Sequence, residues 1–123
     1  MYVGQTSGDG GVVGRAGAHV KSNGTLRERF YEAYGEQIEC AEDWYILTFP
    51  LPKKKKYTGP ESSYRNAVEY LVQTGLNEVR GSYVPPFRVI SNICYSDRCS
   101  EPDVRAIAKS ILSAIEEVFP TIK

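Results

Sequence analysis

Apolar positions at helical spacing predict a helix that begins near Thr25 and ends at Gly35. One face of this helix carries the apolar residues Leu26, Phe30, Ala33 and Tyr34, and the charged residues between them are expected to face solvent. Thr25-x-x-Glu28 has the sequence of a capping box, in which each side chain satisfies a free backbone donor of the other residue. We expect this helix to cover a sheet.

Two further apolar stripes predict helices later in the chain. The first stripe consists of Tyr64, Val68, Leu71 and Val72. Ser62 or Ser63 would cap the start of this helix, and Gly75 would end it. The strongest stripe follows Ser100-x-x-Asp103, with Pro102 in the first turn. It consists of Val104, Ile107, Ala108, Ile111, Leu112, Ile115 and Phe119.

Short β-branched and aromatic runs predict strands at Met1–Gly4, Asp43–Leu51 and Phe87–Tyr95. Between the first run and Lys21, a glycine-rich loop leads into a short helix from about Val13. Residues 53–60 are expected to form a polar loop. The pattern indicates an α/β chain of α+β type, with a small antiparallel sheet flanked by helices.

With 123 residues, 41% of them hydrophobic, the chain is expected to form a single domain over residues 1–123. No apolar run approaches the roughly 20 residues that span a bilayer, and no signal peptide is evident. We therefore expect no membrane partner and an intracellular protein, cytoplasmic or nuclear. Cys40, Cys94 and Cys99 lack metal-binding spacing and are expected to be free thiols, with a Cys94–Cys99 bridge as the alternative.

The formal net charge is zero, whereas nucleic-acid binders usually carry a basic excess that neutralises phosphates. Cations can still gather on one face. The run Lys53 to Lys56, with Arg65, Arg80 and Arg88, provides residues for such a face. A solvated loop is the alternative interpretation of the lysine run.

Arg15 and His19 are the first candidates for chemistry, because their four-residue spacing places both on one side of a helix. An arginine offers paired donors to a phosphate, and a histidine can move a proton near neutral pH. Glu69 could hold a hard divalent cation through its carboxylate. Each of the three residues also has an ordinary structural explanation, as a surface or partly buried side chain.

Tyr2, Gly4 and Asn77 complete the set of candidates. The Tyr2 hydroxyl could hydrogen-bond to a nucleophilic water or to a phosphate, or its ring could belong to the core. Gly4 would let substrate backbone approach closely because it has no side chain. Asn77 could shape the site or simply end the preceding helix.

The order of these pieces resembles the GIY-YIG endonuclease family. The resemblance covers residues 2–80. It rests on Tyr2-Val3-Gly4, Arg15-x-x-x-His19, Tyr34-Gly35, the run from Trp44 to Phe49, Ala67-Val68-Glu69 and Leu76-Asn77. It implies a Mg²⁺-dependent (or Mn²⁺-dependent) endonuclease that hydrolyses nucleic-acid phosphodiesters, with DNA as the expected partner.

By this resemblance, Tyr2, Arg15, His19 and Glu69 are catalytic, Glu69 binds the metal, and Gly4, Arg15 and Asn77 bind substrate. The first motif of the family, a Gly-Ile/Leu-Tyr strand before Tyr2, has no counterpart in the sequence. Truncation, recruitment of another tyrosine or strand, and loss of catalysis all remain open. The last of these would leave a module that binds nucleic acid or protein.

Residues 81–123 lie outside the resemblance and are expected to form an appended strand and helix packed on the 1–80 core. Their role could be to repair the sheet, to form a homodimer contact or to confer substrate choice. The strand predicted at Phe87–Tyr95 is a candidate to pair where the first motif strand would lie.

Overall fold

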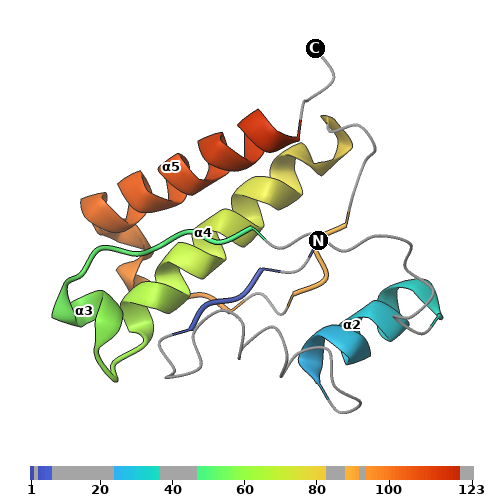
Figure 1. The fold of residues 1–123 in the computed structure, drawn as a ribbon, viewed down its shortest axis with the longest axis horizontal. Coiled ribbons are helices and arrows are strands. Elements are labelled where there is room, and N and C mark those ends of the chain that lie inside the picture. Colours follow the sequence, from blue (N-terminus) through green and yellow to red (C-terminus); the bar gives the residue numbers. More distant parts are fainter. Residues whose placement is uncertain (2, 7–23, 37–46, 83–87, 92–93, 120–123) are drawn as a thin grey trace.

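A computed structural model describes residues 1, 3–6, 24–36, 47–82, 88–91 and 94–119 (Figure 1). The elements in chain order are α2 (Thr25–Tyr34), α3 (Lys55–Thr58), α4 (Ser63–Val79), η2 (Arg80–Ser82), η3 (Asp97–Ser100) and α5 (Pro102–Val118). Helices account for 65% of the described residues, and none of these residues is in a strand.

The predicted α/β fold with an antiparallel sheet is therefore wrong for the part of the chain that the structure describes. A strand needs a ladder of backbone hydrogen bonds, and the opening segment makes only the start of one. The Met1 nitrogen donates to the Arg88 carbonyl, and the Ile90 nitrogen donates to the Met1 carbonyl. The Val3 nitrogen then donates to the hydroxyl of Ser91 instead of to a backbone carbonyl.

The other two predicted strands fall partly outside the described residues. Residues 47–51 of the Asp43–Leu51 run are described and belong to no strand. The same holds for residues 88–91 and 94–95 of the Phe87–Tyr95 run. The short helix expected from about Val13 lies outside the described residues altogether.

α4 and α5 lie side by side and run in the same direction (Figure 1). The buried apolar side chains of both helices join Tyr57 and Cys99 in one core; they are Ala67, Val68, Val72, Leu76, Val104, Ala108 and Ile115. The stripes predicted on these helices are confirmed, since Tyr64, Leu71, Ile107, Ile111, Leu112 and Phe119 pack against the same core. This core unites residues from both sides of position 80.

Gly75 does not close α4, contrary to the prediction, because the helix continues to Val79. Its role is contact with α5. A Cβ at position 75 would lie 2.5 Å from Leu112 Cδ1, so the absence of a side chain lets the two helices approach closely.

The predicted start and end of α2 are confirmed, and Gly35 ends the helix with a positive φ of 67°. The predicted N-cap residues of α2 and α5 are wrong. Gly24, not Thr25, is the N-cap residue of α2, and Glu101, not Ser100, is that of α5. At α4 the Glu61 carboxylate accepts hydrogen bonds from the Ser63 hydroxyl and from the Ser63 nitrogen, and these bonds lower the pKa of Glu61 below its ordinary value.

The expected 53–60 loop contains the single turn of α3, which places Tyr57 in the core at 2% exposure. Arg65 fixes this turn from α4. Its Nη1 donates to the carbonyls of Tyr57, Gly59 and Glu61 at 2.9, 2.7 and 3.1 Å. A buried guanidinium is stable there because backbone oxygens receive its donors.

Candidate functional site

One face of α4 is polar and lies against the opening segment of the chain. Its polar residues are spaced three or four positions apart, which aligns them along the helix; they are Asn66, Glu69, Gln73 and Asn77. This face is opposite to the one that packs on α5. Two residues of this row, Glu69 and Asn77, are candidates that the sequence singled out.

Hydrogen bonds attach the opening segment to this face. The Gln5 amide nitrogen donates to Asn66 Oδ1 at 3.1 Å, and the Gln5 amide oxygen accepts from Arg65 Nε at 2.9 Å. Gln73, which is 1% exposed, donates from Nε2 to the Val3 carbonyl at 3.5 Å. The segment around Gly4, itself exposed, is thereby held beside the middle of α4.

Glu69 is part of the same network, because its Oε1 accepts a 3.1 Å hydrogen bond from Gln73 Nε2. The carboxylate is partly buried. Gln73 therefore orients Glu69 and the Val3 backbone together. Gln73 is not among the candidates predicted from the sequence, although its spacing of four residues from both Glu69 and Asn77 places it on the same helix face.

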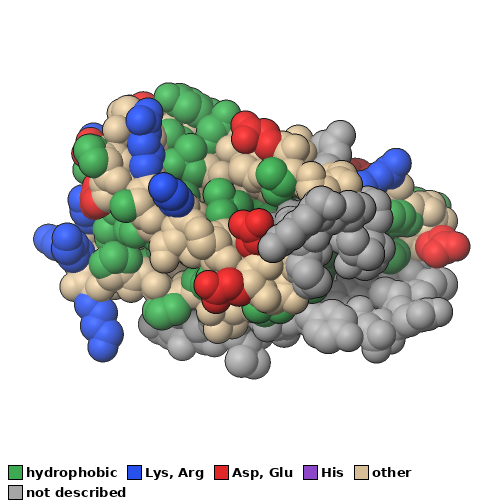
Figure 2. Space-filling view, turned by 90° about the horizontal axis from the view of Figure 1, so that it is seen from above, with side chains coloured by type: hydrophobic (Ala, Val, Ile, Leu, Met, Phe, Trp, Pro, Cys, Tyr) green, Lys and Arg blue, Asp and Glu red, His purple; other side chains and the backbone are tan. Residues whose placement is uncertain are grey.

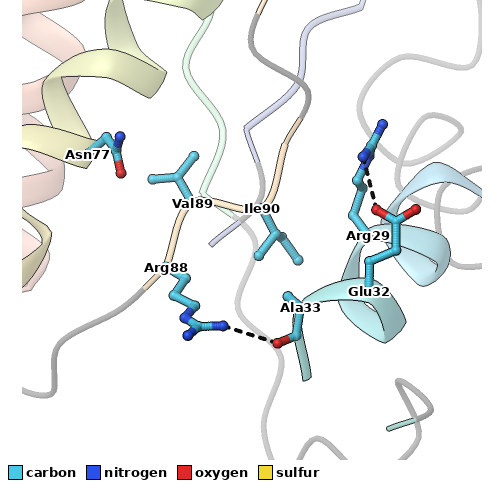
Figure 3. Close-up of a pocket in the computed structure, with 7 residues that line it drawn as sticks. All are labelled: Arg29, Glu32, Ala33, Asn77, Arg88, Val89 and Ile90. Carbon is cyan, nitrogen blue, oxygen red and sulfur yellow. Dashed lines mark hydrogen bonds and ion pairs between the residues drawn. The ribbon is translucent and has the colours of Figure 1, made fainter. Parts of the chain in front are cut away.

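Asn77 lies two turns further along α4, about 12 Å from Glu69 by the helical rise. It lines an open cavity of about 420 Å³ between α4, α2 and residues 88–90 (Figure 3). Arg29 forms a 2.9 Å ion pair with Glu32 there, and Arg88 Nη1 donates to the Ala33 carbonyl at 3.1 Å. Glu32 lines the cavity as well and offsets the charge of Arg29, so Arg88 is the guanidinium that suits a negatively charged ligand there.

The remaining candidates, Tyr2, Arg15 and His19, lie outside the described residues. The predicted convergence of Arg15, His19 and Glu69 is therefore described only from the side of Glu69. Glu69 is linked to the opening segment through Gln73, and the convergence itself stays a prediction.

The predicted Mg²⁺ or Mn²⁺ ion depends on Glu69. The chemistry of this face fits a hard cation, since a carboxylate and neighbouring amide oxygens are the donors that such ions prefer. Within the described ranges no three His, Cys, Asp or Glu side chains gather into a metal-binding group.

Cationic side chains gather at the end of the molecule where α3 lies, on the left in Figure 2. Lys53, Lys54 and Lys55 are exposed there. Arg65 was expected to contribute to a cationic face and does not, because it is 5% exposed and bound to backbone carbonyls. Arg88 is exposed, at the cavity near α2.

A second polar cluster at this end went unnoticed in the sequence because its members are far apart. The Tyr57 hydroxyl donates to Asp103 Oδ2 at 2.8 Å, and Lys56 forms an ion pair with the same oxygen. The hydrogen bond from Lys56, followed by that from Tyr57, lowers the pKa of Asp103 to about 2. Burial, followed by the Asp103 hydrogen bond, raises the pKa of Tyr57.

Cys94 and Cys99 are free thiols, as predicted, and Cys40 lies outside the described residues. Among the described helices, none combines the length and the apolar character needed to cross a bilayer. Comparison with protein-family models, with curated proteins and with solved structures finds no match to this chain.

Proposed function

We propose that this chain is a Mg²⁺-dependent nuclease whose reaction depends on the carboxylate of Glu69. The observation that carries the proposal is the hydrogen-bonded link from Glu69 through Gln73 to the Val3 backbone, which fixes a partly buried carboxylate beside the opening segment. A carboxylate held in one orientation is ready to act without reorganisation. The proposal rests on this polar face and does not require a sheet.

The roles of the other residues come from the GIY-YIG resemblance. Arg15 would bind the scissile phosphate, His19 would assist proton transfer, and Tyr2 would hydrogen-bond to the attacking water. A divalent ion held by Glu69 would neutralise charge that develops on the phosphate oxygens. Gly4, which is exposed on the opening segment beside α4, would leave room for the substrate backbone.

Two cationic regions support nucleic acid as the substrate despite the zero net charge. One comprises the exposed Lys53, Lys54 and Lys55 near α3, and the other comprises Arg29 and Arg88 around the cavity that Asn77 lines. The lysines lie near the start of α4 and the cavity near its end, so positive charge is offered to phosphates at both ends of the polar face, with Glu32 offsetting the charge of Arg29. The proposal places the protein inside the cell, where Cys94 and Cys99 remain reduced.

The test is cleavage of supercoiled plasmid DNA with Mg²⁺ by the wild type and by Glu69→Gln. A glutamine at position 69 keeps an oxygen that can accept from Gln73 but loses the charge. Glu78→Gln is the matched control, since Glu78 is exposed on the same helix. Cleavage by the wild type and the control but not by Glu69→Gln supports the proposal, whereas equal cleavage by all three contradicts it.

The second candidate is a module that binds nucleic acid without cleaving it. The cavity beside Asn77 favours this alternative, because phosphate binding by Arg88, with Arg29 held in its ion pair with Glu32, needs no metal and no catalytic carboxylate. Salt-sensitive DNA binding that is unchanged in Glu69→Gln, without cleavage by the wild type, would establish it.

A further inference from the structure

A groove of about 500 Å³ lies between α4, α5 and the segment that contains Tyr95, Cys99 and Ser100. Leu71 of α4 and Leu112 of α5 contribute to its largely apolar surface, and Tyr70 and Tyr95 also line it. This volume is typical of sites that accommodate one small organic ligand or one unit of a polymer. Of the residues proposed above for the nuclease reaction, the ones that the structure describes, Gly4, Glu69 and Asn77, do not line it.

Tyr95 is unusual in this groove because it is 69% exposed. Its ring packs edge-on against Tyr70, with ring centres 5.3 Å apart and planes at 90°. This geometry holds the Tyr95 ring in place while leaving most of its surface to solvent. A fixed, exposed aromatic ring is a surface on which another flat ring can stack.

Two cations flank the aromatic pair. Arg105 and Lys109 are four residues apart on α5, which aligns them along the groove. Arg105 Nε donates to the Cys99 carbonyl at 3.1 Å, which anchors the guanidinium at the groove wall. Within the described part of the chain, no hydrogen bond or ion pair engages the Nη atoms of Arg105 or the Nζ of Lys109.

We propose that this groove binds single-stranded nucleic acid, with a base stacked on Tyr95 and the backbone phosphates beside Arg105 and Lys109. The combination of an exposed aromatic ring and a row of cations complements a polymer that alternates flat bases with negative charges. Bases in a duplex stack on one another and are not available to Tyr95. The inference rests on the proposed function for its nucleic-acid substrate and adds the strand form that the protein recognises.

Binding is measured by fluorescence anisotropy with a labelled oligothymidylate of about 12 nucleotides, without divalent ions so that no cleavage occurs. Tyr95→Ala should raise Kd on the order of tenfold, the size expected for loss of one stacked base. Tyr31→Ala is the matched control, because Tyr31 is 53% exposed on α2, and its Kd should match that of the wild type. Lys109→Gln should reduce the slope of log Kd against log salt concentration by about 0.7.

An abasic oligonucleotide of the same length separates stacking from charge. The Kd of the wild type for the abasic oligonucleotide should equal the Kd of Tyr95→Ala for the oligothymidylate. Tyr95→Ala should not raise the Kd for the abasic oligonucleotide any further. Equal Kd values for the wild type and Tyr95→Ala with the oligothymidylate would overturn the inference. So would polyglutamate binding that depends on Tyr95 while DNA binding does not, since the groove would then recognise acidic peptides.

The two proposals fail separately. Tyr95-dependent binding without any cleavage supports the groove and contradicts the nuclease. Cleavage that depends on Glu69, with DNA binding that is indifferent to Tyr95, supports the nuclease and contradicts the groove. Glu78→Gln should bind the oligothymidylate with the wild-type Kd, since Glu78 does not line the groove.

Discussion

Gly75 of α4 faces Leu112 of α5 at a distance that leaves no room for a methyl group, since a Cβ at position 75 would lie 2.5 Å from Leu112 Cδ1. Gly75→Ala should therefore lower the free energy of unfolding by about 1 kcal/mol through overpacking. In a Leu112→Ala background, Gly75→Ala should instead raise the free energy of unfolding by up to about 1 kcal/mol, because alanine favours a helix more than glycine does. Urea denaturation of the four variants measures both effects, and an identical effect in both backgrounds would refute the contact.

The hydrogen bonds from Lys56 and from Tyr57 to Asp103 link the turn of α3 to the first turn of α5 and should make stability depend on pH at both extremes. The folded state lowers the pKa of Asp103 to about 2, from an ordinary value of 3.8. The carboxylate thus stabilises the fold above pH 3.8, and this contribution should disappear as the pH falls towards 2. Asp103→Asn should have a flatter stability profile over that range in acid-titrated urea denaturation.

Tyr57 should act at the alkaline end. Its pKa is raised in the folded state above the ordinary value of 10.0. The neutral hydroxyl therefore contributes stability below pH 10, which is lost as the pH rises towards the folded-state value. Tyr57→Phe should remove this alkaline dependence; the same slope above pH 10 in both proteins would show that Tyr57 titrates alike in the folded and unfolded chains.

Arg65 should be needed for stability although it makes no ion pair with a described residue. Arg65→Lys replaces a planar fork, which meets three carbonyls and Gln5, by a single ammonium group. We expect a loss of about 1 to 3 kcal/mol in unfolding free energy and faster amide hydrogen exchange at residues 57–61. Arg29→Lys, at a partly exposed ion pair, should cost less than about 1 kcal/mol.

Gln73 should act as a positioning residue for Glu69. Gln73→Leu fills similar space but cannot donate to Glu69 or to Val3, so the rate of DNA cleavage should fall on the order of tenfold. The KM for DNA should stay near the wild-type value, because Gln73 is buried away from the substrate. A higher KM with unchanged kcat would instead indicate a purely structural role in holding the opening segment.

The sequence identified α2, α4 and α5 because helical periodicity is local and survives whatever the helix packs against. It misassigned the end of α4, since a glycine that stops a helix and a glycine that admits a neighbouring helix look alike until Leu112 is placed beside it. It missed the burial of Tyr57, because the lysines around that residue suggested a solvated loop.

The strands were misassigned for a different reason. Strand formation depends on a partner from a distant part of the chain, and Val3 meets the hydroxyl of Ser91 where a ladder would need a backbone carbonyl. Of the site, the sequence singled out Glu69 and Asn77 as candidates, but it placed Asn77 after the end of the helix, whereas α4 continues to Val79. It could not show that Gln73 connects Glu69 to the opening segment, since that link depends on the tertiary contact with Val3.

The most direct test of the nuclease proposal is the single-turnover rate of DNA cleavage at saturating Mg²⁺, measured for Glu69→Gln and Glu78→Gln alongside DNA affinity in the absence of the metal. The proposal predicts that Glu69→Gln cleaves on the order of a hundredfold or more slowly than Glu78→Gln while binding DNA equally well. Equal cleavage rates for the two variants, or no cleavage by the wild type under any of these conditions, would contradict it.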